Sequence, residues 1–327
     1  MDGNGIWSGI DIAKATLDVR LGSGGPVRTF ANTTAGHRQL LAWVTQAPVA
    51  GIVVEATGPY HQAIVAALTA AHLPVPVVNP QWIKHFRASS GRAAKNDRAD
   101  ADLLARYGEQ KHPAPSRQPS RAERELQELV AAREDLVTLR TAERNRLQMT
   151  TNTLIRSQLT GRIDALTTDI TALEDAIDGL IAADPAMMER RTLLESMPGI
   201  GPVISATLLA YLPEIDALSR RQLAALAGLA PYDQDSGTQR GQRHISGGRV
   251  RVRRALYQAA TTSRRNTVLG TRWATLRSRR PHKVAMIALA RYQLSMLAVM
   301  VREHLRWEDT RVGQGMYLHD QSALPVA

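Results

Sequence analysis

Two aspartates, Asp97 and Asp100, lie three residues apart in the segment KNDRADADLLA that begins at Lys95. On a helix this spacing places both side chains on one face, where their like charges repel each other. A bound cation removes that repulsion, and carboxylate oxygens suit Mg²⁺ or Mn²⁺, which keep positions open for phosphate oxygens. The alternative interpretation is an ordinary acidic helix start, which capping and the helix dipole favour without a metal. Asp102 faces another side of this helix, and it replaces Asp100 as a ligand only if the helix phase differs by a residue or two.

Two further carboxylates end predicted strands. Asp11 follows a short apolar strand, and Glu55 closes a buried-type strand. If these strands lie side by side, Asp11 and Glu55 meet Asp97 and Asp100, and the carboxylates repel one another strongly at low dielectric. Such a cluster is natural as a two-metal phosphoryl-transfer site, in which one metal activates the nucleophile and the other stabilises the leaving oxygen. The alternatives are a strand-end turn residue for Asp11 and a surface carboxylate for Glu55.

The elements that position these carboxylates follow a definite order. Three strands come first, and helices and strands alternate after them, which is the order of a ribonuclease-H-like α/β domain. In such a sheet the first strand and the fourth are neighbours, so the ends that carry Asp11 and Glu55 meet. We expect this domain over residues 1–110, with strands over 6–11, 16–21, 27–30, 51–55 and 74–78, helices from 32 and after 59, and the Asp97 helix at its end.

The middle region, 111–190, opens with a proline-rich linker and then lacks proline up to Pro185. Leucine and isoleucine recur there at alternating steps of four and three, a heptad seam that predicts a coiled coil. Its partner is either the earlier helix around Leu126 in the same chain or a second protomer. We favour a dimer because a long strict seam needs a partner helix. The seam consists of Leu159, Ile163, Leu166, Ile170, Leu173, Ile177 and Leu180.

The third region, 191–312, opens with the segment MPGIGP, which has the form of a helix-hairpin-helix turn. Its glycines, Gly199 and Gly201, let backbone N–H groups approach a phosphate at the positive end of the next helix. The alternative is a tight turn between packed helices. Further along we expect a basic connection over 273–282, a helix over 284–301 and a loosely ordered tail over 313–327.

A polar loop over 231–241 contains Ser236 beside Gly237. The glycine neighbour can expose the serine hydroxyl, although most loop serines carry no chemistry. A basic run with little acid nearby comes directly after Ser236, and such a run suits the phosphates of DNA. The candidate phosphate contacts are Arg240, Arg243, Arg249, Arg251, Arg253 and Arg254.

The 327-residue chain has a net charge of +11 and a pI near 10.5, which indicates a polyanionic partner, either nucleic acid or an anionic membrane surface. It contains no cysteine, so disulfides and cysteine-based zinc sites are excluded. The N-terminus lacks the basic segment and apolar run of a signal peptide, and no apolar stretch reaches roughly 18 residues, the length of a membrane span. We therefore expect a soluble intracellular protein with no membrane partner.

A series of short motifs runs along the chain: GIDIAK with Asp11, FANTTAGH, VEATGPY with Glu55, VVNP, KNDRADA with Asp97 and Asp100, MPGIGPVISATLLAYL, AALAGLAP, DSG with Ser236, and ISGGRVRVRRALY. In this order the motifs resemble the DEDD-type insertion-sequence transposases, which are related to the pilin-gene invertases and are described as RNA-guided bridge recombinases. The family usually has Lys-Thr-Asp at positions 95–97, where this chain has Lys-Asn-Asp, and the carboxylates are unaffected. The family tends to have Ser-Lys where this chain has Ser246-Gly247, a change that touches a phosphate or RNA contact.

The resemblance implies an N-terminal RuvC-like domain of the RNase H-like fold, a coiled-coil linker and a mainly helical C-terminal transposase domain. It implies that Asp11, Glu55, Asp97 and Asp100 bind Mg²⁺ or Mn²⁺, and that Ser236 attacks DNA to form a covalent phosphoserine intermediate. A composite site would form between protomers of a tetramer assembled from dimers. An element-encoded noncoding guide RNA would pair with donor and target DNA, in the bacterial cytoplasm and at the nucleoid when the protein is active.

Two other functions stay open on the sequence. A metal-dependent RuvC-like Holliday-junction nuclease would use water and leave Ser236 without a role, and only the resemblance separates it from a serine recombinase. A non-catalytic nucleic-acid-binding scaffold fits the basic charge equally well, but the acidic quartet argues against it. The target site does not follow from the sequence, because a guide RNA would take the choice of target away from the protein.

Overall fold

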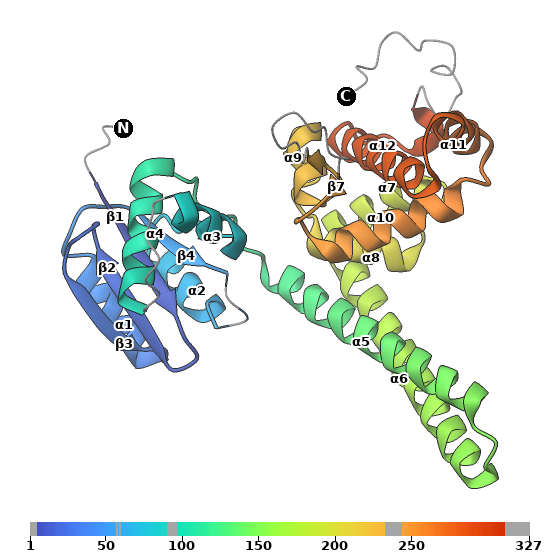
Figure 1. Ribbon diagram of the computed structural model, residues 1–327, viewed down its shortest axis with the longest axis horizontal. Coiled ribbons are helices and arrows are strands. Elements are labelled where there is room, and N and C mark those ends of the chain that lie inside the picture. Colours follow the sequence, from blue (N-terminus) through green and yellow to red (C-terminus); the bar gives the residue numbers. More distant parts are fainter. Residues whose placement is uncertain (1–4, 57, 59, 90–96, 233–243, 311–327) are drawn as a thin grey trace. The chain divides into compact units, whose positions relative to one another are not determined.

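The computed structural model describes residues 5–310, except 57, 59, 90–96 and 233–243, and of residues 97–99 the backbone alone. The chain forms two compact units, Met1–Gln118 and Pro119–Ala327 (Figure 1). The first unit is a mixed α/β domain, and the second is almost entirely helical.

A sheet in the order β3-β2-β1-β4-β5 organises the first unit. Strand β1 runs antiparallel to β2 and parallel to β4, so the predicted neighbourhood of the first and fourth strands is confirmed. The parallel pair places the carboxyl ends of β1 and β4 at the same edge of the sheet. The strands are β1 (Ile6–Ile12), β2 (Thr16–Leu21), β3 (Val27–Ala31), β4 (Val49–Glu55) and β5 (Val77–Val78).

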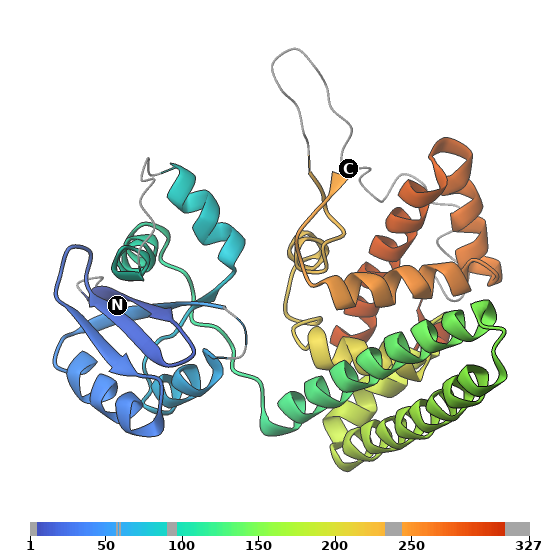
Figure 2. The ribbon, with the colours of Figure 1, turned by 60° about the horizontal axis from the view of Figure 1, so that its bottom comes forward.

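Helices cover both faces of this sheet (Figure 2). The helices α1 (Thr34–Val44) and α2 (Gln62–Ala70) pack on one face, in a core that includes Ile10 and Ile64. On the other face α3 (Pro80–Ser89) and α4 (Asp97–Lys111) bury Val53 with Ile83, Leu103 and Leu104.

Helix α3 lies between the predicted strand over 74–78 and the Asp97 helix, where no helix was predicted. Pro80 occupies its first turn, and the Asn79 side chain accepts a hydrogen bond from the Gln81 N–H at 2.8 Å, as at other helix starts. The basic residues of the helix obscured the apolar periodicity, and this start signal was overlooked.

The heptad seam is buried within a single chain. Helices α5 (Arg121–Met149) and α6 (Thr153–Ala183) form an antiparallel hairpin (Figure 1). An ion pair between Arg133 of α5 and Glu174 of α6 connects the two helices. The intramolecular alternative therefore supplies a partner for the seam, and a dimer no longer follows from the seam alone. Dimerisation stays a prediction. The buried residues of α6 are Leu159, Ile163, Ile170, Ile177 and Ile181.

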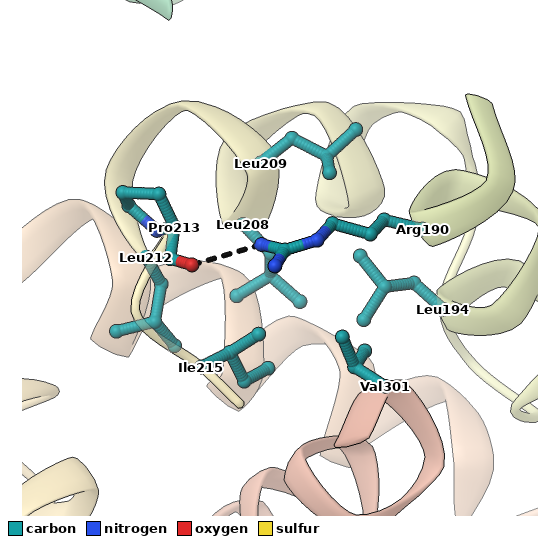
Figure 3. Close-up of a pocket in the computed structure, with 8 residues that line it drawn as sticks. All are labelled: Arg190, Leu194, Leu208, Leu209, Leu212, Pro213, Ile215 and Val301. Atoms are coloured by element: carbon teal, nitrogen blue, oxygen red, sulfur yellow. Dashed lines mark hydrogen bonds between the residues drawn. The ribbon is translucent and has the colours of Figure 1, made fainter. Parts of the chain in front are cut away.

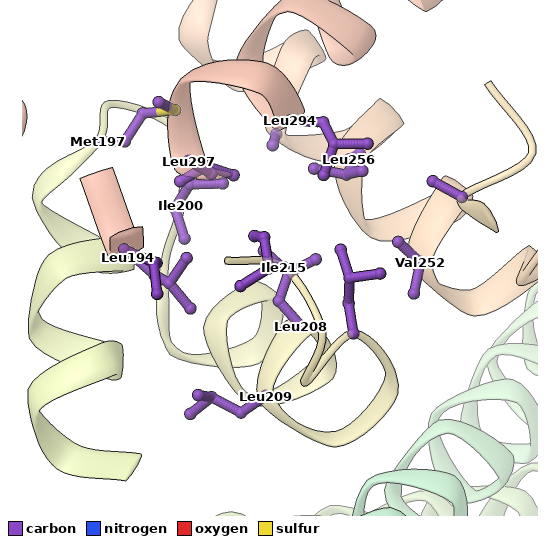
Figure 4. Close-up of a cluster of buried hydrophobic side chains, with 14 of the residues drawn as sticks. Leu194, Met197, Ile200, Leu208, Leu209, Ile215, Val252, Leu256, Leu294 and Leu297 are labelled. Atoms are coloured by element: carbon purple, nitrogen blue, oxygen red, sulfur yellow. The ribbon is translucent and has the colours of Figure 1, made fainter. Parts of the chain in front are cut away.

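The rest of the second unit is a bundle of helices around one apolar core. Figure 4 shows Leu208, Leu256, Leu294 and Leu297 around that core on three helices, and all four side chains are buried. A small antiparallel pair, β6 (Pro231–Tyr232) and β7 (His244–Ile245), borders it. The helices are α7 (Pro185–Ser196), α8 (Pro202–Tyr211), α9 (Arg220–Leu226), α10 (Val250–Ser263), α11 (Thr267–Arg279), α12 (His282–Arg302) and the short 3-10 helix η1 (Trp307–Asp309).

The predicted basic connection over 273–282 was wrong, because most of it belongs to helix α11. The Asn266 side chain caps this helix by accepting hydrogen bonds from the Val268 and Leu269 N–H groups at 2.9 and 3.2 Å. Arginines dominate the second half of the helix, and they hid its apolar positions from the sequence analysis.

Helix α12 also corrects the expectation that no stretch is long and apolar enough to span a membrane. By length and composition its 21 residues meet that criterion, with a mean hydropathy of 1.7 over the most apolar window. However, 56% of that window is buried inside the second unit, where Leu289, Leu294 and Leu297 form part of the core. The helix has the burial of a core helix.

Candidate acidic site and nucleic-acid interface

Asp11 and Glu55 end adjacent parallel strands. The register pairs Ile10 of β1 with Val54 of β4, so the two carboxylate residues follow at the next position on each strand. Both side chains are partly buried. The sequence predicted that these strand ends would meet, and the register brings them together.

Both carboxylates belong to the face of the sheet that α4 covers. Gly9 approaches this helix so closely that a Cβ atom would lie 2.2 Å from the Ala101 carbonyl oxygen. Side chains alternate along a strand, so Asp11, two residues after Gly9, belongs to the same face. On β4 the side chain of Val53 packs against Leu103 and Leu104, and Glu55 follows it by two residues.

The direction of α4 brings its N-terminus towards this edge of the sheet. Ala101 lies over Gly9, and Gly108 lies against Trp7, nearer the start of β1. The helix therefore runs antiparallel to β1, and its first residues lie nearest the strand end that carries Asp11 (Figure 1). Close approach needs glycine at position 9, because any side chain there would collide with the backbone of α4.

Two predicted metal ligands, Asp97 and Asp100, lie on α4, and the structure describes the side chain of Asp100 alone. The Asp97 side chain lies outside the described residues, although its backbone begins the helix. The Asp100 carboxylate accepts a hydrogen bond from the Arg87 guanidinium of α3 at 2.6 Å. Among the side chains that are described, no group of three or more His, Asp or Glu residues lies close enough to hold one metal ion.

Asp102 has a structural role at the other end of the sheet. Its carboxylate accepts hydrogen bonds from the Gly24 N–H at 2.9 Å and from Arg106 at 2.7 Å, and Arg20 lies 3.5 Å away. Burial by itself would raise the pKa of Asp102, but these donors outweigh burial and lower it. The carboxylate ties α4 to the β2–β3 turn, away from Asp11.

Asp18 was not among the predicted site residues. This residue lies directly opposite Asp11 in the antiparallel β1–β2 pair, and its carboxylate accepts a hydrogen bond from the Thr29 hydroxyl. Directly opposed residues in an antiparallel pair share a face, and like charges in that position are unfavourable. Residues two apart on a strand share a face, so Asp18 lies on the same face of β2 as Arg20, which reaches Asp102 on α4. This alternation could have indicated the position of Asp18.

Asn32 braces the loops that follow the two strand ends. Its side-chain N–H group donates to the carbonyl oxygens of Ala13 and Tyr60, at 3.1 and 3.2 Å. Its oxygen lies 2.8 Å from Nε2 of His37, and burial lowers the pKa of His37. The brace therefore links Ala13, which follows β1, to Tyr60, which lies in the segment after β4.

Comparisons with known proteins match both units. Residues 8–154 match a family model described as a transposase, and residues 191–274 match one described as a transposase of the IS116/IS110/IS902 family. The chain is 31% identical over 263 residues to the pilin gene-inverting protein of Moraxella bovis. This match covers 78% of this chain and 81% of that protein. The chain belongs to the IS116/IS110/IS902 family of transposases.

Shorter matches to proteins of insertion elements agree with this assignment. The transposase is 32% identical over 123 residues to a protein of insertion element IS116 from Streptomyces clavuligerus, covering 35% of this chain and 30% of that protein. It is 36% identical over 148 residues to a protein of insertion element IS900 from Mycobacterium paratuberculosis, covering 39% and 35%. The transposase is therefore an enzyme that acts on DNA.

In the second unit of the transposase the two predicted phosphate-binding glycines differ. Gly199 has a φ of +92° and packs on α10, where a Cβ atom would lie 2.6 Å from the Ala259 carbonyl oxygen. Gly201 precedes the first turn of α8, and a Cβ atom there would meet nothing within 4 Å. Packing explains Gly199, whereas Gly201 leaves the start of α8 open.

Three of the predicted phosphate-contacting arginines already have partners in the second unit. Arg249 donates to both carboxylate oxygens of Glu214, and Arg251 donates to Glu134 on α5 at 2.7 Å. Arg253 donates to the Gly247 carbonyl oxygen at 2.7 Å. Their phosphate contacts stay predictions, and these bonds give each guanidinium a structural role.

Of the four remaining candidate residues in this region, only Arg254 belongs to the described part of the chain. The Arg254 side chain is exposed on α10. The nucleophile candidate Ser236 and the phosphate candidates Arg240 and Arg243 lie outside the described residues.

A small cavity that Arg190 lines together with Leu212 and Ile215 has a structural explanation. Figure 3 shows Arg190 lying among Leu194, Leu208 and Val301, with its guanidinium donating to the Pro213 carbonyl oxygen at 2.9 Å. The same guanidinium forms an ion pair with Asp216. The cavity has a volume of about 10 Å³, roughly the room for one water molecule. It is therefore too small for a substrate.

Proposed function

We propose that this transposase cuts and rejoins DNA strands through the Ser236 hydroxyl, with Asp11, Glu55, Asp97 and Asp100 holding Mg²⁺ or Mn²⁺. The observation that carries the proposal is the placement of Asp11 and Glu55 on one face of adjacent strand ends, next to the start of α4. We also propose that the first unit, with this sheet order, has a RuvC-like form of the RNase H-like fold.

The donor chemistry at this sheet edge fits a divalent cation. Asp11 and Glu55 belong to one face, Asp18 lies opposite Asp11, and carboxylate oxygens are the ligands that Mg²⁺ and Mn²⁺ prefer. A positive ion offsets the repulsion among these charges.

Asp100 needs one adjustment to join this set. Its oxygen bonded to Arg87 is occupied, so either its second oxygen binds the cation or Arg87 moves when DNA arrives. Arg87 next to the site also offers a positive charge for a DNA phosphate.

The proposed step conserves the phosphodiester energy. The Ser236 oxygen forms a bond to a DNA phosphorus while the bond from that phosphorus to one deoxyribose oxygen breaks. The serine proton leaves, and the released oxygen takes up a proton as a hydroxyl group. A bound divalent cation supplies Lewis-acid stabilisation of the phosphate charge. The covalent ester can then react with a second DNA hydroxyl, so rejoining needs no nucleotide cofactor.

The partners follow from the resemblance rather than from a contact in the structure. We propose donor and target DNA as substrates, an element-encoded noncoding RNA that pairs with both, and assembly of dimers into a tetramer on the DNA. The high positive charge of the chain supports polyanionic partners of this kind.

A second candidate is a metal-dependent junction nuclease that uses water. The carboxylates support it as well, because hydrolysis needs the cation and the acids but no serine. The two candidates differ in whether DNA becomes covalently attached to the protein.

A denaturing gel separates them. The purified chain is incubated with Mg²⁺, the flanking noncoding RNA of the element and labelled DNA, and Ser236→Ala and Asp11→Asn are compared with the wild type. We expect an RNA-dependent DNA–protein adduct that both substitutions abolish. Cleavage without an adduct, unchanged in Ser236→Ala, would establish the hydrolytic nuclease instead.

A further inference from the structure

A long acid-free stretch covers three helices of the second unit. Between Asp235 and Glu303 the sequence contains no Asp or Glu, and α10, α11 and α12 all lie within this stretch. Arginines on these helices therefore depend on acids from elsewhere in the fold. Arg249 and Arg251 find Glu214 and Glu134, but other arginines are placed differently.

Arg272 on α11 lies on an aromatic ring. Its guanidinium carbon is 3.8 Å from the centroid of the Tyr292 ring on α12. The Nε atom is buried, and within the described part of the chain it has no hydrogen-bond partner. Stacking on tyrosine holds a guanidinium in place and leaves its N–H edge available to an anion.

Other arginines surround this position. The positive charge of Arg220, at the start of α9, acts on both Arg272 and Arg291. Arg280, at the end of α11, acts on Arg291 as well. Burial, and then these like charges, lower the pKa of Arg291, and burial is the main cause of the lowered pKa of Arg272.

This arrangement differs from the arginines that stabilise the fold. Arg190, Arg191 and Arg249 each form an ion pair with an Asp or Glu. In the described part of the chain, no ion pair to an Asp or Glu is present for Arg220, Arg272 or Arg280. Like charges repel, so a bound anion would offset the repulsion that Arg220 exerts on Arg272 and that Arg220 and Arg280 exert on Arg291.

We propose that Arg220, Arg272, Arg280 and Arg291 form a binding site for the phosphodiester backbone of a nucleic acid. One guanidinium group can donate two parallel hydrogen bonds to the oxygens of a phosphate. Because these arginines come from three helices, they suit a nucleic-acid backbone that passes across all three. The site deepens the proposed function and rests on its nucleic-acid substrates, but it does not depend on Ser236 or on a metal. None of these four arginines was among the predicted phosphate contacts, which were Gly199, Gly201 and arginines between positions 240 and 254.

The test measures binding without chemistry. Fluorescence anisotropy with a labelled DNA duplex and an RNA duplex of the same sequence, in EDTA, is recorded across a range of salt concentrations for the full chain. The variants are Arg220→Gln, Arg280→Gln and the double variant. Arg221→Gln, an exposed neighbour on α9, removes the same charge outside the site.

We expect the double variant to bind about tenfold more weakly than Arg221→Gln at physiological salt. The slope of log K against log salt should become shallower by about one for each phosphate that the protein no longer neutralises. Weakening on one polymer alone identifies DNA or RNA as the source of the phosphate. Binding of both polymers within about twofold of the Arg221→Gln control, at an unchanged salt slope, would overturn the site.

A melting experiment separates binding from a structural role. Removing like charge should leave the melting temperature of the double variant in low-phosphate buffer equal to that of the wild type, or raise it. A lower melting temperature together with weaker binding would overturn the proposal, because these arginines would then serve the fold. Because EDTA prevents the metal-dependent reaction, a failure of the serine mechanism in the adduct assay leaves this result unaffected.

Discussion

Each unit of the transposase contains charged residues with partners in the fold and charged residues that we propose bind a ligand, acidic in the first unit and basic in the second. In the first unit Asp102 is neutralised by Arg20, Arg106 and a backbone N–H, whereas Asp11 and Glu55 end neighbouring strands beside the start of α4. In the second unit Arg249 and Arg251 have acidic partners, whereas the positive charge of Arg220 acts on Arg272 and on Arg291. Charge density along the sequence therefore does not identify a ligand site. What distinguishes a charged side chain with a structural role is an oppositely charged partner in the folded chain.

The largest expected effect comes from the strand-end carboxylates. Asp11→Asn or Glu55→Gln should reduce strand cleavage by about a thousandfold, because several kcal/mol of charge stabilisation are lost with the cation. Asp102→Asn should retain cleavage within about tenfold of the wild type when measured well below its melting temperature. Single-turnover cleavage of labelled DNA measures both. Equal losses in Asp11→Asn and Asp102→Asn would erase the distinction between the two ends of the sheet.

Asp102→Asn should instead lower stability. The amide offers one oxygen acceptor where the carboxylate serves Gly24, Arg106 and Arg20, so we expect a cost of about 2 kcal/mol in the unfolding free energy of the first unit. Urea unfolding measures this cost. Asp18→Asn is a control, since its carboxylate is on the same face but accepts from Thr29 near the surface.

The paired arginines should cost less. Arg251→Gln removes a hydrogen bond to Glu134 and the stacking of its guanidinium 5.1 Å from the Tyr211 ring centroid, so we expect a loss of about 1 kcal/mol in stability. Arg254→Gln, on the same helix but exposed, should change stability by no more than about 0.5 kcal/mol. Thermal unfolding of the two variants compares them directly, and a larger loss in Arg254→Gln would contradict the structural role of Arg251.

The smallest expected effect is a pH dependence at the brace. Burial lowers the pKa of His37 below its ordinary value of 6.5, so near that pH the folded chain binds fewer protons than the unfolded chain. The contribution of neutral His37 is complete above this value and is lost as the pH falls below it. The stability lost between about pH 7.5 and about pH 5.5 should be smaller in His37→Gln, measured by urea unfolding. An equal loss in both chains would show that His37 does not titrate on unfolding.

Local signals made part of the site predictable. Strand ends with carboxylates, and the order of the elements around them, were enough to predict that the strand ends carrying Asp11 and Glu55 would be neighbours. The partner of Arg251 was not predictable, because Glu134 lies 117 residues away in the sequence and only packing brings them together. The heptad seam was equally compatible with a partner helix in the same chain and one in another.

Two helices that were not predicted carry a recognisable start signal in the sequence. Asn79 with Pro80 and Asn266 each mark the start of a helix, and the basic residues inside those helices obscured the apolar periodicity. The arginine group depends on the pairing of α11 with α12, so no local motif could have predicted it.

The most direct test of the metal site is calorimetric titration of the full chain with Mn²⁺. Wild type and Asp102→Asn should bind the ion with similar affinity, because Asp102 is held away from the strand ends. Asp11→Asn and Glu55→Gln should each weaken binding by about tenfold or more. Binding that survives both strand-end substitutions but is lost in Asp102→Asn would contradict the placement of the metal site at the carboxyl ends of β1 and β4.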